Sequence, residues 1–288
     1  MIKKGIILAG GSGTRMSPIT KAVNKQLLPL YDKPLFFYPL SVLMLAQIKD
    51  ILIIVNKGQV DQFKKVLPNG NRLGIKIQYA EQDRPRGLPD AFLVGEKFIN
   101  NQPVSLILGD NFFYGQSLTK KLIECTKLNN GAKVFLHPVK KTSLYGIATI
   151  NKKNKITKII EKPKKTDSNL AVTGLYFFDN KVVSFCKSLK PSKRNELEIV
   201  DLLNKYKNNN KLTAEIIGRG GAWLDTGSIE NFNDTANFVA SIENRQGFKI
   251  GCLEEIALNK NWINKKIIDQ SIKFYGNCEY SKYLSNLT

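Results

Sequence analysis

The sequence predicts an α/β fold of three layers, αβα, in which helices cover both faces of a mixed, Rossmann-like β-sheet and a helical appendix follows. Three observations carry this prediction. In the first half of the chain, short apolar runs alternate with helical patterns, which is typical of a largely parallel sheet. A glycine-rich turn follows the first apolar run directly, at the end of a strand where such sheets bind their ligands. The second half changes to a hairpin pattern and then to helices.

Taken in order, the expected elements alternate as this fold requires. We expect strands at 6–9, 50–55, 75–80, 104–108, 132–139, 171–178 and 212–217, and a β-hairpin formed by 147–150 and 156–160. We expect helices at 35–46, 59–67, 90–98, 118–128, 181–189, 198–207 and 229–246, and in the last 40 residues. No repeat or low-complexity linker interrupts the chain, so we expect a main domain at 1–240 and a helical appendix at 241–288 packed on it as one structural unit.

The charge balance is unusual, whereas the rest of the composition is that of an ordinary globular protein. Hydrophobic residues make up 42% of the chain and charged residues 24%, yet the formal net charge is +20. The lysines are scattered and often neighbour asparagines, and no RNA- or DNA-binding motif accompanies them. We therefore interpret most of this charge as solvated surface and expect no nucleic-acid partner.

The cysteines and the apolar runs indicate a cytoplasmic protein. Cys125, Cys186, Cys252 and Cys278 lie far apart and lack C-x-x-C spacing, which disfavours a zinc site or a disulfide framework. The chain shows no signal-peptide pattern, and no apolar run approaches the roughly 18 residues of a membrane span. We expect reduced thiols, a cytoplasmic location and no contact with a membrane.

The segment after the first strand has the features of a phosphate-binding turn. Gly10, Gly11 and Gly13 fall within four residues. A strand that ends in such glycines turns sharply and exposes backbone N–H groups, which suits an oxyanion. Arg15 adds a planar fork of donors that matches phosphate geometry, and Lys25 supplies a second positive charge. The pattern predicts a cradle for a triphosphate.

Two better-known phosphate loops are excluded. The P-loop string G-x-x-x-x-G-K-[ST] does not occur in the chain. The dinucleotide fingerprint G-x-G-x-x-G would begin at Gly11, but Met16 stands at its third glycine position. An ordinary β-to-α turn rich in glycine remains the alternative interpretation of the glycines alone.

Two aspartates are candidate metal ligands. Asp110 follows a buried strand and Gly109, at the sheet edge where ligands bind. Asp225 lies just before a second turn. Mg²⁺ is usually held by one or two carboxylates together with substrate phosphates, so this pair could share one ion. Each aspartate taken singly is also explained as a turn or capping residue.

The end of the predicted hairpin offers groups for a sugar phosphate. Glu161 could accept sugar hydroxyls, and Lys162, fixed by Pro163, is a point charge for a second phosphate. The backbone could approach a sugar closely at Gly146, and also at Val172, which lies two residues before Gly174. A solvated Lys-Pro turn is the alternative for the first pair.

These strings together resemble the sugar-phosphate nucleotidylyltransferase family over nearly the whole chain. The matching segments are Gly5–Arg15, Lys25–Pro29, Tyr31–Pro34, Leu108–Asn111, Glu161–Pro163, Ala171–Tyr176, Glu196–Ile199 and Ala222–Gly227. Each string is moderately specific, and eight in this order are highly specific. The resemblance implies the nucleotide-diphospho-sugar transferase type of α/β fold, with the catalytic domain at 1–240.

The resemblance also implies a role for each matching residue. Gly10, Gly13, Thr14, Arg15, Lys25 and Gln26 would bind the nucleoside triphosphate, Gln82 and Gly87 would contact the pyrimidine, Asp110 and Asp225 would hold Mg²⁺, Asp110, Gly146, Glu161 and Val172 would bind glucose, and Lys162 would bind its phosphate. Arg15, Lys25 and Lys162 would act in catalysis by stabilising the negative charge that develops on the phosphates.

The reaction that the resemblance implies joins glucose 1-phosphate to dTTP, giving dTDP-glucose and pyrophosphate on the way to dTDP-rhamnose and related sugars. The family also implies a homotetramer. Nucleotidyl transfer requires mainly positioning and charge neutralisation. The one histidine, His137, lies in a strand-like run and is expected to be a packed strand residue rather than a nucleophile. We therefore expect direct displacement without a covalent intermediate.

Two positions depart from the family pattern. At the base-reading loop, Pro89 and Asp90 replace the usual Ala and Gln, which leaves the nucleobase preference open. Proline suits the first turn of a helix, so we expect the fold to tolerate it. The segment Cys252–Ala257 matches the family's second, regulatory nucleotide site, but Asn259 stands where the family carries an arginine. We therefore expect weakened feedback control.

Three other functions remain alternatives. The same chemistry with UTP is the nearest, because thymine and uracil differ by one methyl group, and a pocket discriminates such a group by only about 1–3 kcal/mol. A non-catalytic sugar-nucleotide sensor would not need Arg15, Lys25, Asp110, Lys162 and Asp225 together. A basic nucleic-acid-binding protein is suggested by the net charge alone.

Overall fold

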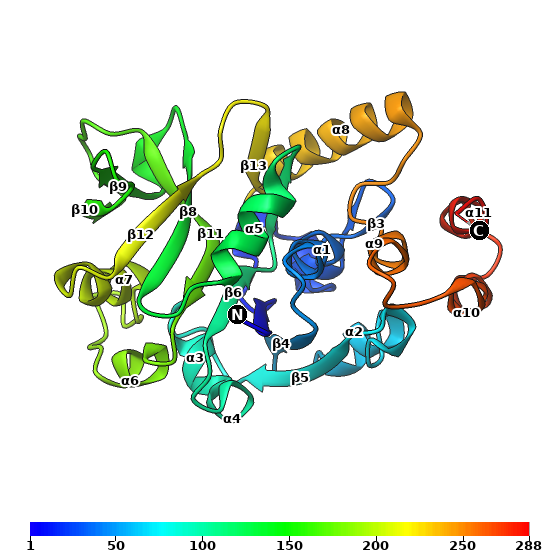
Figure 1. The fold of residues 1–288 in the computed structure, drawn as a ribbon, viewed down its shortest axis with the longest axis horizontal. Helices are drawn as coiled ribbons and strands as arrows, with labels where there is room; N and C mark the ends of the chain where they lie inside the picture. The colour runs from blue at the N-terminus through cyan, green and yellow to red at the C-terminus, as the bar shows by residue number, and fades with distance from the viewer. Residues whose placement is uncertain (288) are drawn as a thin grey trace.

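The computed structural model describes residues 1–287, and a mixed β-sheet with helices on both faces forms its centre (Figure 1). Within these residues the sheet has nine strands, in the order β10-β9-β11-β6-β1-β4-β5, and β8 joins it between β11 and β12. The strands are β1 (Lys4–Leu8), β4 (Asp50–Asn56), β5 (Lys76–Gln82), β6 (Val104–Leu108), β8 (Ala132–Pro138), β9 (Gly146–Ile150), β10 (Ile156–Glu161), β11 (Leu170–Phe178) and β12 (Leu212–Ile216). The predicted strands and the predicted hairpin are all present.

The sheet is parallel on one side and antiparallel on the other. β6, β1, β4 and β5 run parallel, whereas β11 runs antiparallel to β6, β8 and β9. Leu8 pairs with Ile54 of β4 and with Leu108 of β6, so β1 and β6 end at the same level, and β4 continues two residues further to Asn56. The turns that follow β1, β4 and β6 therefore meet at one edge of the sheet.

Helices pack against both faces of the sheet. They are α1 (Phe37–Leu45), α2 (Val60–Val66), α3 (Asp90–Val94), α4 (Glu96–Ile99), α5 (Leu118–Thr126), α6 (Val182–Lys187), α7 (Ile199–Asn208), α8 (Ile229–Gln246), α9 (Leu253–Asn259), α10 (Lys265–Tyr275) and α11 (Glu279–Ser285). Ile7 of β1 belongs to a core with Phe36 and Phe63, whereas its neighbour Ile6 belongs to a separate core with Phe92. Because successive strand residues point to opposite faces, these two cores make three layers. The predicted fold class is confirmed.

The structure differs from the expected elements in two places. The helix expected at 90–98 is divided into α3 and α4 at Gly95, whose backbone lies so close to the sheet that a Cβ would be 3.1 Å from Ile6 and 3.2 Å from Leu52. Two small sheets were not expected: β7 (Asn111–Gly115) with β13 (Gly221–Asp225), and β2 (Pro29–Leu30) with β3 (Lys33–Pro34). β2 and β3 have only two residues each, and β7 and β13 each contain a glycine and a polar residue within five positions, so none of them gives a continuous apolar run.

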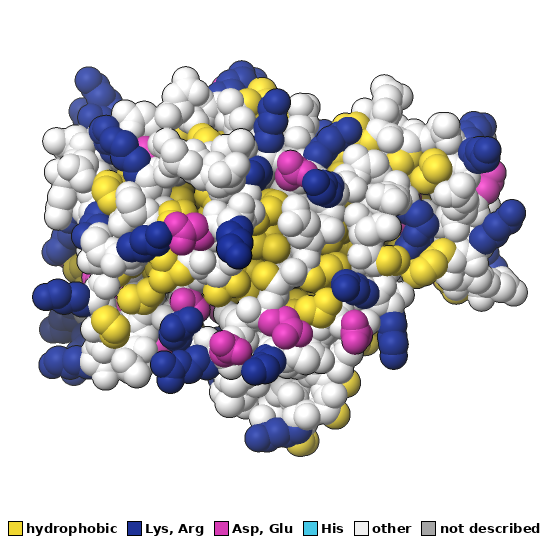
Figure 2. Space-filling model, turned by 90° about the horizontal axis from the view of Figure 1, so that it is seen from below, with side chains coloured by type: hydrophobic (Ala, Val, Ile, Leu, Met, Phe, Trp, Pro, Cys, Tyr) yellow, Lys and Arg dark blue, Asp and Glu magenta, His cyan; other side chains and the backbone are white. Residues whose placement is uncertain are grey.

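Basic side chains are spread over the surface rather than gathered in one stripe. On the face shown in Figure 2, lysines and arginines lie both across the middle and along the edges, and carboxylates lie among them. This distribution agrees with the interpretation of the positive charge as solvated surface. No helix within 1–287 is both long enough and apolar enough to cross a membrane.

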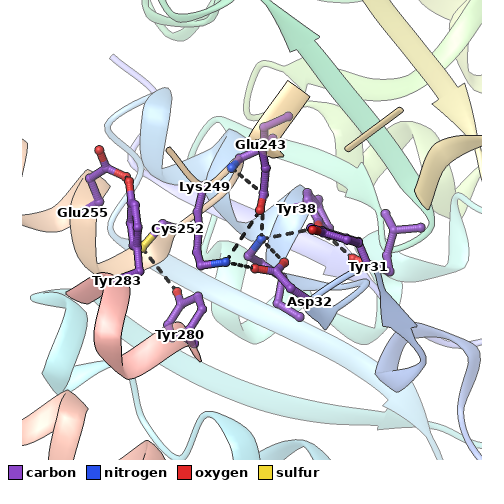
Figure 3. Close-up of polar contacts among 12 residues, drawn as sticks. Tyr31, Asp32, Tyr38, Glu243, Lys249, Cys252, Glu255, Tyr280 and Tyr283 are labelled. Carbon is purple, nitrogen blue, oxygen red and sulfur yellow. Dashed lines mark hydrogen bonds and ion pairs between the residues drawn. The ribbon is translucent and has the colours of Figure 1, made fainter. Parts of the chain in front are cut away.

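The C-terminal helices pack on α1 and on one another. α9 contacts α1, and α10 and α11 contact each other at the end of the molecule farthest from the hairpin (Figure 1). The hydroxyl groups of Tyr280 and Tyr283 on α11 point toward α9, where Tyr283 donates a hydrogen bond to Glu255 at 2.7 Å (Figure 3). The four cysteines are free thiols, as expected. α8 runs through residue 240 without a break, and the division of the chain at that position stays a prediction.

Candidate active site

The glycine turn after β1 is held against the strand beside it. Asn56, at the end of β4, accepts a hydrogen bond from the N–H of Gly11 at 2.9 Å and donates one to its carbonyl oxygen at 2.9 Å. Gly13 has φ 59°, a left-handed conformation that favours glycine, and a short 3-10 helix, Thr14–Met16, follows it. A Cβ on Gly10 would lie 1.9 Å from Nε2 of Gln82. Glycine at this position therefore lets the end of β5 approach the turn.

A capping side chain places Lys25 and Gln26. Asn24 precedes the 3-10 helix Lys25–Leu27, and its Oδ1 accepts a hydrogen bond from the N–H of Gln26 at 2.8 Å. Its Nδ2 donates to the carbonyl of Ala9 at 3.2 Å, which ties this segment to the end of β1. Nζ of Lys25 then reaches Oδ2 of Asp110 at 2.7 Å, with the lysine side chain 8% exposed. The second cation of the cradle is thus fixed by a buried ion pair.

Asp110 and Asp225 lie at adjacent strand ends. Asp110 follows β6, and Asp225 ends β13, where it pairs in register with Asn111. Thr226 donates hydrogen bonds to the carbonyl oxygen of Asp110 from its N–H at 3.1 Å and from its Oγ1 at 2.8 Å. A Cβ on Gly227 would lie 3.0 Å from Asp225 and 2.9 Å from Arg15, so both side chains lie next to this glycine.

The two carboxylates have opposite pKa shifts. Burial alone would raise the pKa of Asp110, but the charge and the hydrogen bond of Lys25 outweigh it and hold this pKa below its ordinary value. Burial, followed by repulsion from Asp110, raises the pKa of Asp225 to about 6. A divalent cation between the two would relieve this repulsion. Within 1–287 no group of three or more His, Cys, Asp or Glu side chains could hold a metal, so the pair would need ligands from a substrate, as Mg²⁺ sites commonly do.

The hairpin brings the expected sugar-binding residues together. Gly146 begins β9 and pairs in register with Glu161 at the end of β10. A Cβ on Gly146 would lie 3.2 Å from Oε2 of Glu161 and 4.0 Å from Cβ of Val172. Burial raises the pKa of Glu161. Lys162 has φ 43° and donates its backbone N–H to Tyr145 at 3.0 Å, and its side chain, 48% exposed, places Nζ 3.8 Å from Glu161.

The predicted site residues line two adjoining hollows. The larger, of 440 Å³, is bordered by Gly10, Arg15, Gln82, Gly87, Asp110, Gly146, Glu161, Lys162, Val172 and Asp225 among others. The smaller, of 280 Å³, is bordered by Gly10, Gly11, Ser12, Gly13, Thr14, Arg15, Lys25, Gln26, Asp110 and Gly227. Gly10, Gly11, Arg15 and Asp110 belong to both walls. Every predicted site residue therefore faces one cleft, and His137 borders neither hollow.

Several residues of the cleft were missed by the sequence interpretation. Arg194 borders the larger hollow, and its Nη2 donates to both carboxylate oxygens of Glu198 at 3.0 and 2.9 Å. The matched string begins at Glu196, so its neighbouring arginine was available as a signal. Trp223 and Asn111 also border this hollow, and both lie in matched strings.

Two distant segments join over the cleft. The N–H of Leu197 donates a hydrogen bond to the carbonyl oxygen of Arg86 at 2.8 Å. Gly87 has φ 98°, and a Cβ there would lie 2.0 Å from the carbonyl oxygen of Leu197. Glycine is required at this position both by the backbone conformation and by the close approach. The loop after β5 and the segment before α7 thus form a joint, which we call the Arg86–Leu197 bridge.

Comparison with known proteins gives a consistent result. The sequence profile of the nucleotidyl transferase family matches residues 4–242. The chain is 49% identical to a glucose-1-phosphate thymidylyltransferase of Neisseria meningitidis over 99% of both chains. It is 42% identical to the enzyme of the same name from Mycobacterium tuberculosis over 99% of this chain and 98% of the relative.

Solved structures agree with the sequence relatives. A Bacillus anthracis protein described as a glucose-1-phosphate thymidylyltransferase, crystallised with sucrose, has a TM-score of 0.75 and 39% identity, covering 82% of this chain and 94% of that one. A UDP-glucose pyrophosphorylase in complex with UDP-glucose has a TM-score of 0.74 and 28% identity, covering 84% and 100%.

Proposed function

This chain belongs to the nucleotidyl transferase family, and from that premise we propose that it is a glucose-1-phosphate thymidylyltransferase. The proposed substrates are dTTP and glucose 1-phosphate, and the products are dTDP-glucose and pyrophosphate. An oxygen of the sugar phosphate attacks the α-phosphorus of dTTP and forms a new P–O bond. The bond from that phosphorus to the oxygen of the β-phosphate breaks, and pyrophosphate leaves with the electron pair.

The proposal rests mainly on one observation, which is that the two hollows share a wall. Arg15 and Asp110 border both the glycine cradle and the sugar side of the cleft. A triphosphate in the cradle and a sugar phosphate in the larger hollow would therefore meet at these residues. Holding two reactants in line can account for about 7–11 kcal/mol of a barrier.

On the nucleotide side, we assign the triphosphate to the turn Gly10–Arg15 with Lys25 and Gln26. The cations Arg15 and Lys25 would stabilise the charge on the α-phosphate and on the departing pyrophosphate. Gln82 and Gly87 would contact the pyrimidine edge. Mg²⁺, held by Asp110, Asp225 and phosphate oxygens, would supply further charge neutralisation when bound.

On the sugar side, we assign glucose to Gly146, Glu161, Val172 and Asp110, and its phosphate to Lys162. The closeness of Glu161 to the backbone of Gly146 supports this assignment. Arg194 adds a second cation for that phosphate, oriented by its double hydrogen bond to Glu198.

The test measures pyrophosphate release with dTTP or UTP, each paired with several sugar 1-phosphates. We expect the highest kcat/KM with dTTP and glucose 1-phosphate. Asp110→Asn should abolish this release while the melting temperature changes little. Full activity of that variant would contradict the metal assignment, and release only with other sugars would contradict the proposed substrate.

UTP is the second candidate for the nucleotide. The structural likeness to a UDP-glucose pyrophosphorylase favours it, and so does the departure of Pro89 and Asp90 from the family's base-reading loop. A pocket separates thymine from uracil by only about 1–3 kcal/mol, so we expect slower turnover with UTP rather than none.

We further propose direct displacement, a homotetrameric assembly, a cytoplasmic location and a place at the start of dTDP-rhamnose synthesis. Ping-pong initial rates or a trapped nucleotidyl-enzyme would contradict direct displacement. Asn259 ends α9, where the family's regulatory site carries a cation, and we expect activity to persist at high dTDP-rhamnose. Strong inhibition by this sugar nucleotide would refute that expectation.

A further inference from the structure

Asn111 occupies the centre of a buried hydrogen-bond network in the wall of the cleft. It begins β7 directly after Asp110, and only 2% of the residue is exposed. Its Oδ1 accepts hydrogen bonds from Nε1 of Trp223 at 2.6 Å and from the N–H of Gly174 at 3.0 Å. Its Nδ2 donates to Oδ1 of Asp110 at 3.0 Å. One carboxamide therefore contacts three elements that line the cleft.

The chemistry of the partners fixes which way this amide faces. The two ends of an amide have nearly the same shape, so their orientation has to be inferred from their neighbours. The indole N–H of Trp223 and the backbone N–H of Gly174 are donors only, and both require an acceptor. The oxygen of Asn111 must face them, and its N–H₂ group must face Asp110.

This arrangement leaves Asp110 with little freedom to rotate. Its Oδ1 is bound by Asn111 and its Oδ2 by Lys25, while its carbonyl oxygen accepts two hydrogen bonds from Thr226. Each carboxylate oxygen has more than one acceptor direction, so the directions left over remain for the cleft.

The same amide joins the strands that carry the other site residues. Trp223 lies on β13, which ends at Asp225, and Gly174 lies on β11 beside Val172. A Cβ on Gly174 would be 2.6 Å from Oδ1 of Asn111, so only glycine permits this hydrogen bond. A shift of Asn111 would thus move the two carboxylates relative to the sugar side.

We propose that Asn111 is a positioning residue of the transfer reaction, which holds the Asp110 carboxylate in its reactive orientation by donating a hydrogen bond to Oδ1. The proposal rests on the proposed function, because Asp110 is assigned there to the metal and the sugar. Asn111 acts through Asp110 and needs no contact with either substrate.

The informative variant is Asn111→Asp. It keeps an acceptor for Trp223 and Gly174, so the links between strands remain, but an oxygen replaces the donor that faces Asp110. We expect kcat to fall by about 10- to 100-fold, the usual cost of removing an outer-shell partner of a site, with KM for glucose 1-phosphate changed by less than about threefold. The melting temperature should fall, because the variant places a second carboxylate in a buried position directly beside Asp110.

The matched control is Ser105→Ala. Ser105 is fully buried on β6, and its Oγ donates to the carbonyl oxygen of Tyr176 on β11 at 3.0 Å, so it also links strands through a buried hydrogen bond. It contacts no site side chain. We expect this variant to lose stability and to keep its kcat. If Asn111 only joined strands, the Asn111→Asp variant, which keeps those links, would also keep its kcat, and the proposal would be overturned.

A crystal structure of the Asn111→Asp protein gives a readout that needs no turnover. We expect the Asp110 carboxylate to rotate away from residue 111 while Trp223 and Gly174 stay in place. An unmoved Asp110 would refute the proposal even if activity fell. If the unchanged protein released no pyrophosphate, the proposed function would fail, whereas this structural result would still decide whether Asn111 orients Asp110.

Discussion

Two clusters of charge in this protein, each built around a buried lysine, have opposite designs. The first lies at the short β2–β3 hairpin, not at the β9–β10 hairpin, and we call it the hairpin cluster. It consists of Asp32, in the turn after β2, and Lys33, at the start of β3, together with Glu243 and Lys249 near the end of α8 (Figure 3). Lys33 contacts Asp32 and lies 3.1 Å from Glu243, and Lys249 contacts Asp32 and lies 3.6 Å from Glu243. Two positive and two negative groups thus neutralise one another completely.

The second, the cleft cluster, consists of Arg15, Lys25, Asp110 and Asp225. Only Lys25 and Asp110 form an ion pair, whereas Arg15 and Asp225 take part in no salt bridge among residues 1–287. Burial, followed by repulsion from Asp110, raises the pKa of Asp225 and outweighs the nearby cations Lys25 and Arg15. Both clusters contain two positive and two negative groups. The comparison teaches that charges paired with one another serve the fold, whereas charges left unpaired at a cleft are available to charged ligands.

The largest effect is expected from Lys33→Met in the hairpin cluster. It leaves Asp32 and Glu243 buried with one cation for two carboxylates. Breaking a buried ion pair by removing one partner typically costs about 3–5 kcal/mol. Urea unfolding should show a loss of stability in this range. A loss below about 1 kcal/mol would mean that the cluster is not a structural lock.

The same substitution at the cleft, Lys25→Met, should act on rate instead. We expect kcat/KM for pyrophosphate release to fall by about 100- to 1,000-fold, the usual cost of removing one group that stabilises developing charge. Stability should fall less than in Lys33→Met, because Lys25 pairs with one carboxylate instead of two and that carboxylate, on Asp110, is 22% exposed to the cleft. Equal losses of stability in the two variants would erase the distinction between the clusters.

The pH dependence of stability should separate the clusters further. The folded-state pKa of Asp225, about 6, lies above its ordinary value of 3.8, so the folded protein binds the extra proton between these values. Its contribution to stability is therefore lost as pH rises from about 4 to 6, by up to about 3 kcal/mol. In metal-free buffer Asp225→Asn should be the more stable protein at pH 7.5, and the gain should vanish at pH 4.

Adding Mg²⁺ with a nucleotide gives the control for this experiment. The cation would neutralise both carboxylates, so the unchanged protein should gain stability at pH 7.5 whereas the Asp225→Asn variant should gain less. A variant with the same pH profile as the unchanged protein would contradict the assigned repulsion.

The smallest effect is expected at an exposed pair. Lys187 lies 2.5 Å from Glu96, but the two side chains are 56% and 48% exposed. Lys187→Met should change stability by less than about 1 kcal/mol and leave kcat/KM unaltered, because water screens such pairs. Thermal unfolding and initial rates provide the check. A larger change would show that two charges stabilise the protein by lying close together, even when both are exposed.

The sequence predicted the cleft cluster but not the hairpin cluster. Asp110 follows an apolar strand and Lys25 follows a glycine turn, so each is marked by its position at the end of a recognisable element. Asp32 and Lys33 belong to a matched string, yet nothing in that string indicates partners at Glu243 and Lys249. Such a pairing depends on where α8 ends in space, which no local pattern contains.

The same limit explains the other differences between prediction and structure. The large sheet was predictable because its buried strands are continuous apolar runs. The pairing of β7 with β13 joins five-residue segments that are far apart in sequence, and it places Asn111 beside Trp223. Arg194 was missed because its role in the site depends on the turn that places it at the cleft, and no local pattern predicts that turn. Local composition therefore predicted the elements, while long-range contacts decided which side chains meet.

The Arg86–Leu197 bridge has a consequence for how substrate preference can change. Residues assigned to the base come from the first third of the chain, and those assigned to the sugar come mainly from 146–198. Most substitutions among the base-binding residues should therefore leave the sugar preference unchanged, and most substitutions among the sugar-binding residues should leave the base preference unchanged. Gly87 and Leu197 are the exception, because they are in direct contact. A larger side chain at Gly87 would displace the segment around Leu197, and so would affect both the base side and the sugar side of the cleft. Attempts to broaden the sugar range should leave this junction intact, and attempts to alter both preferences together should begin with it.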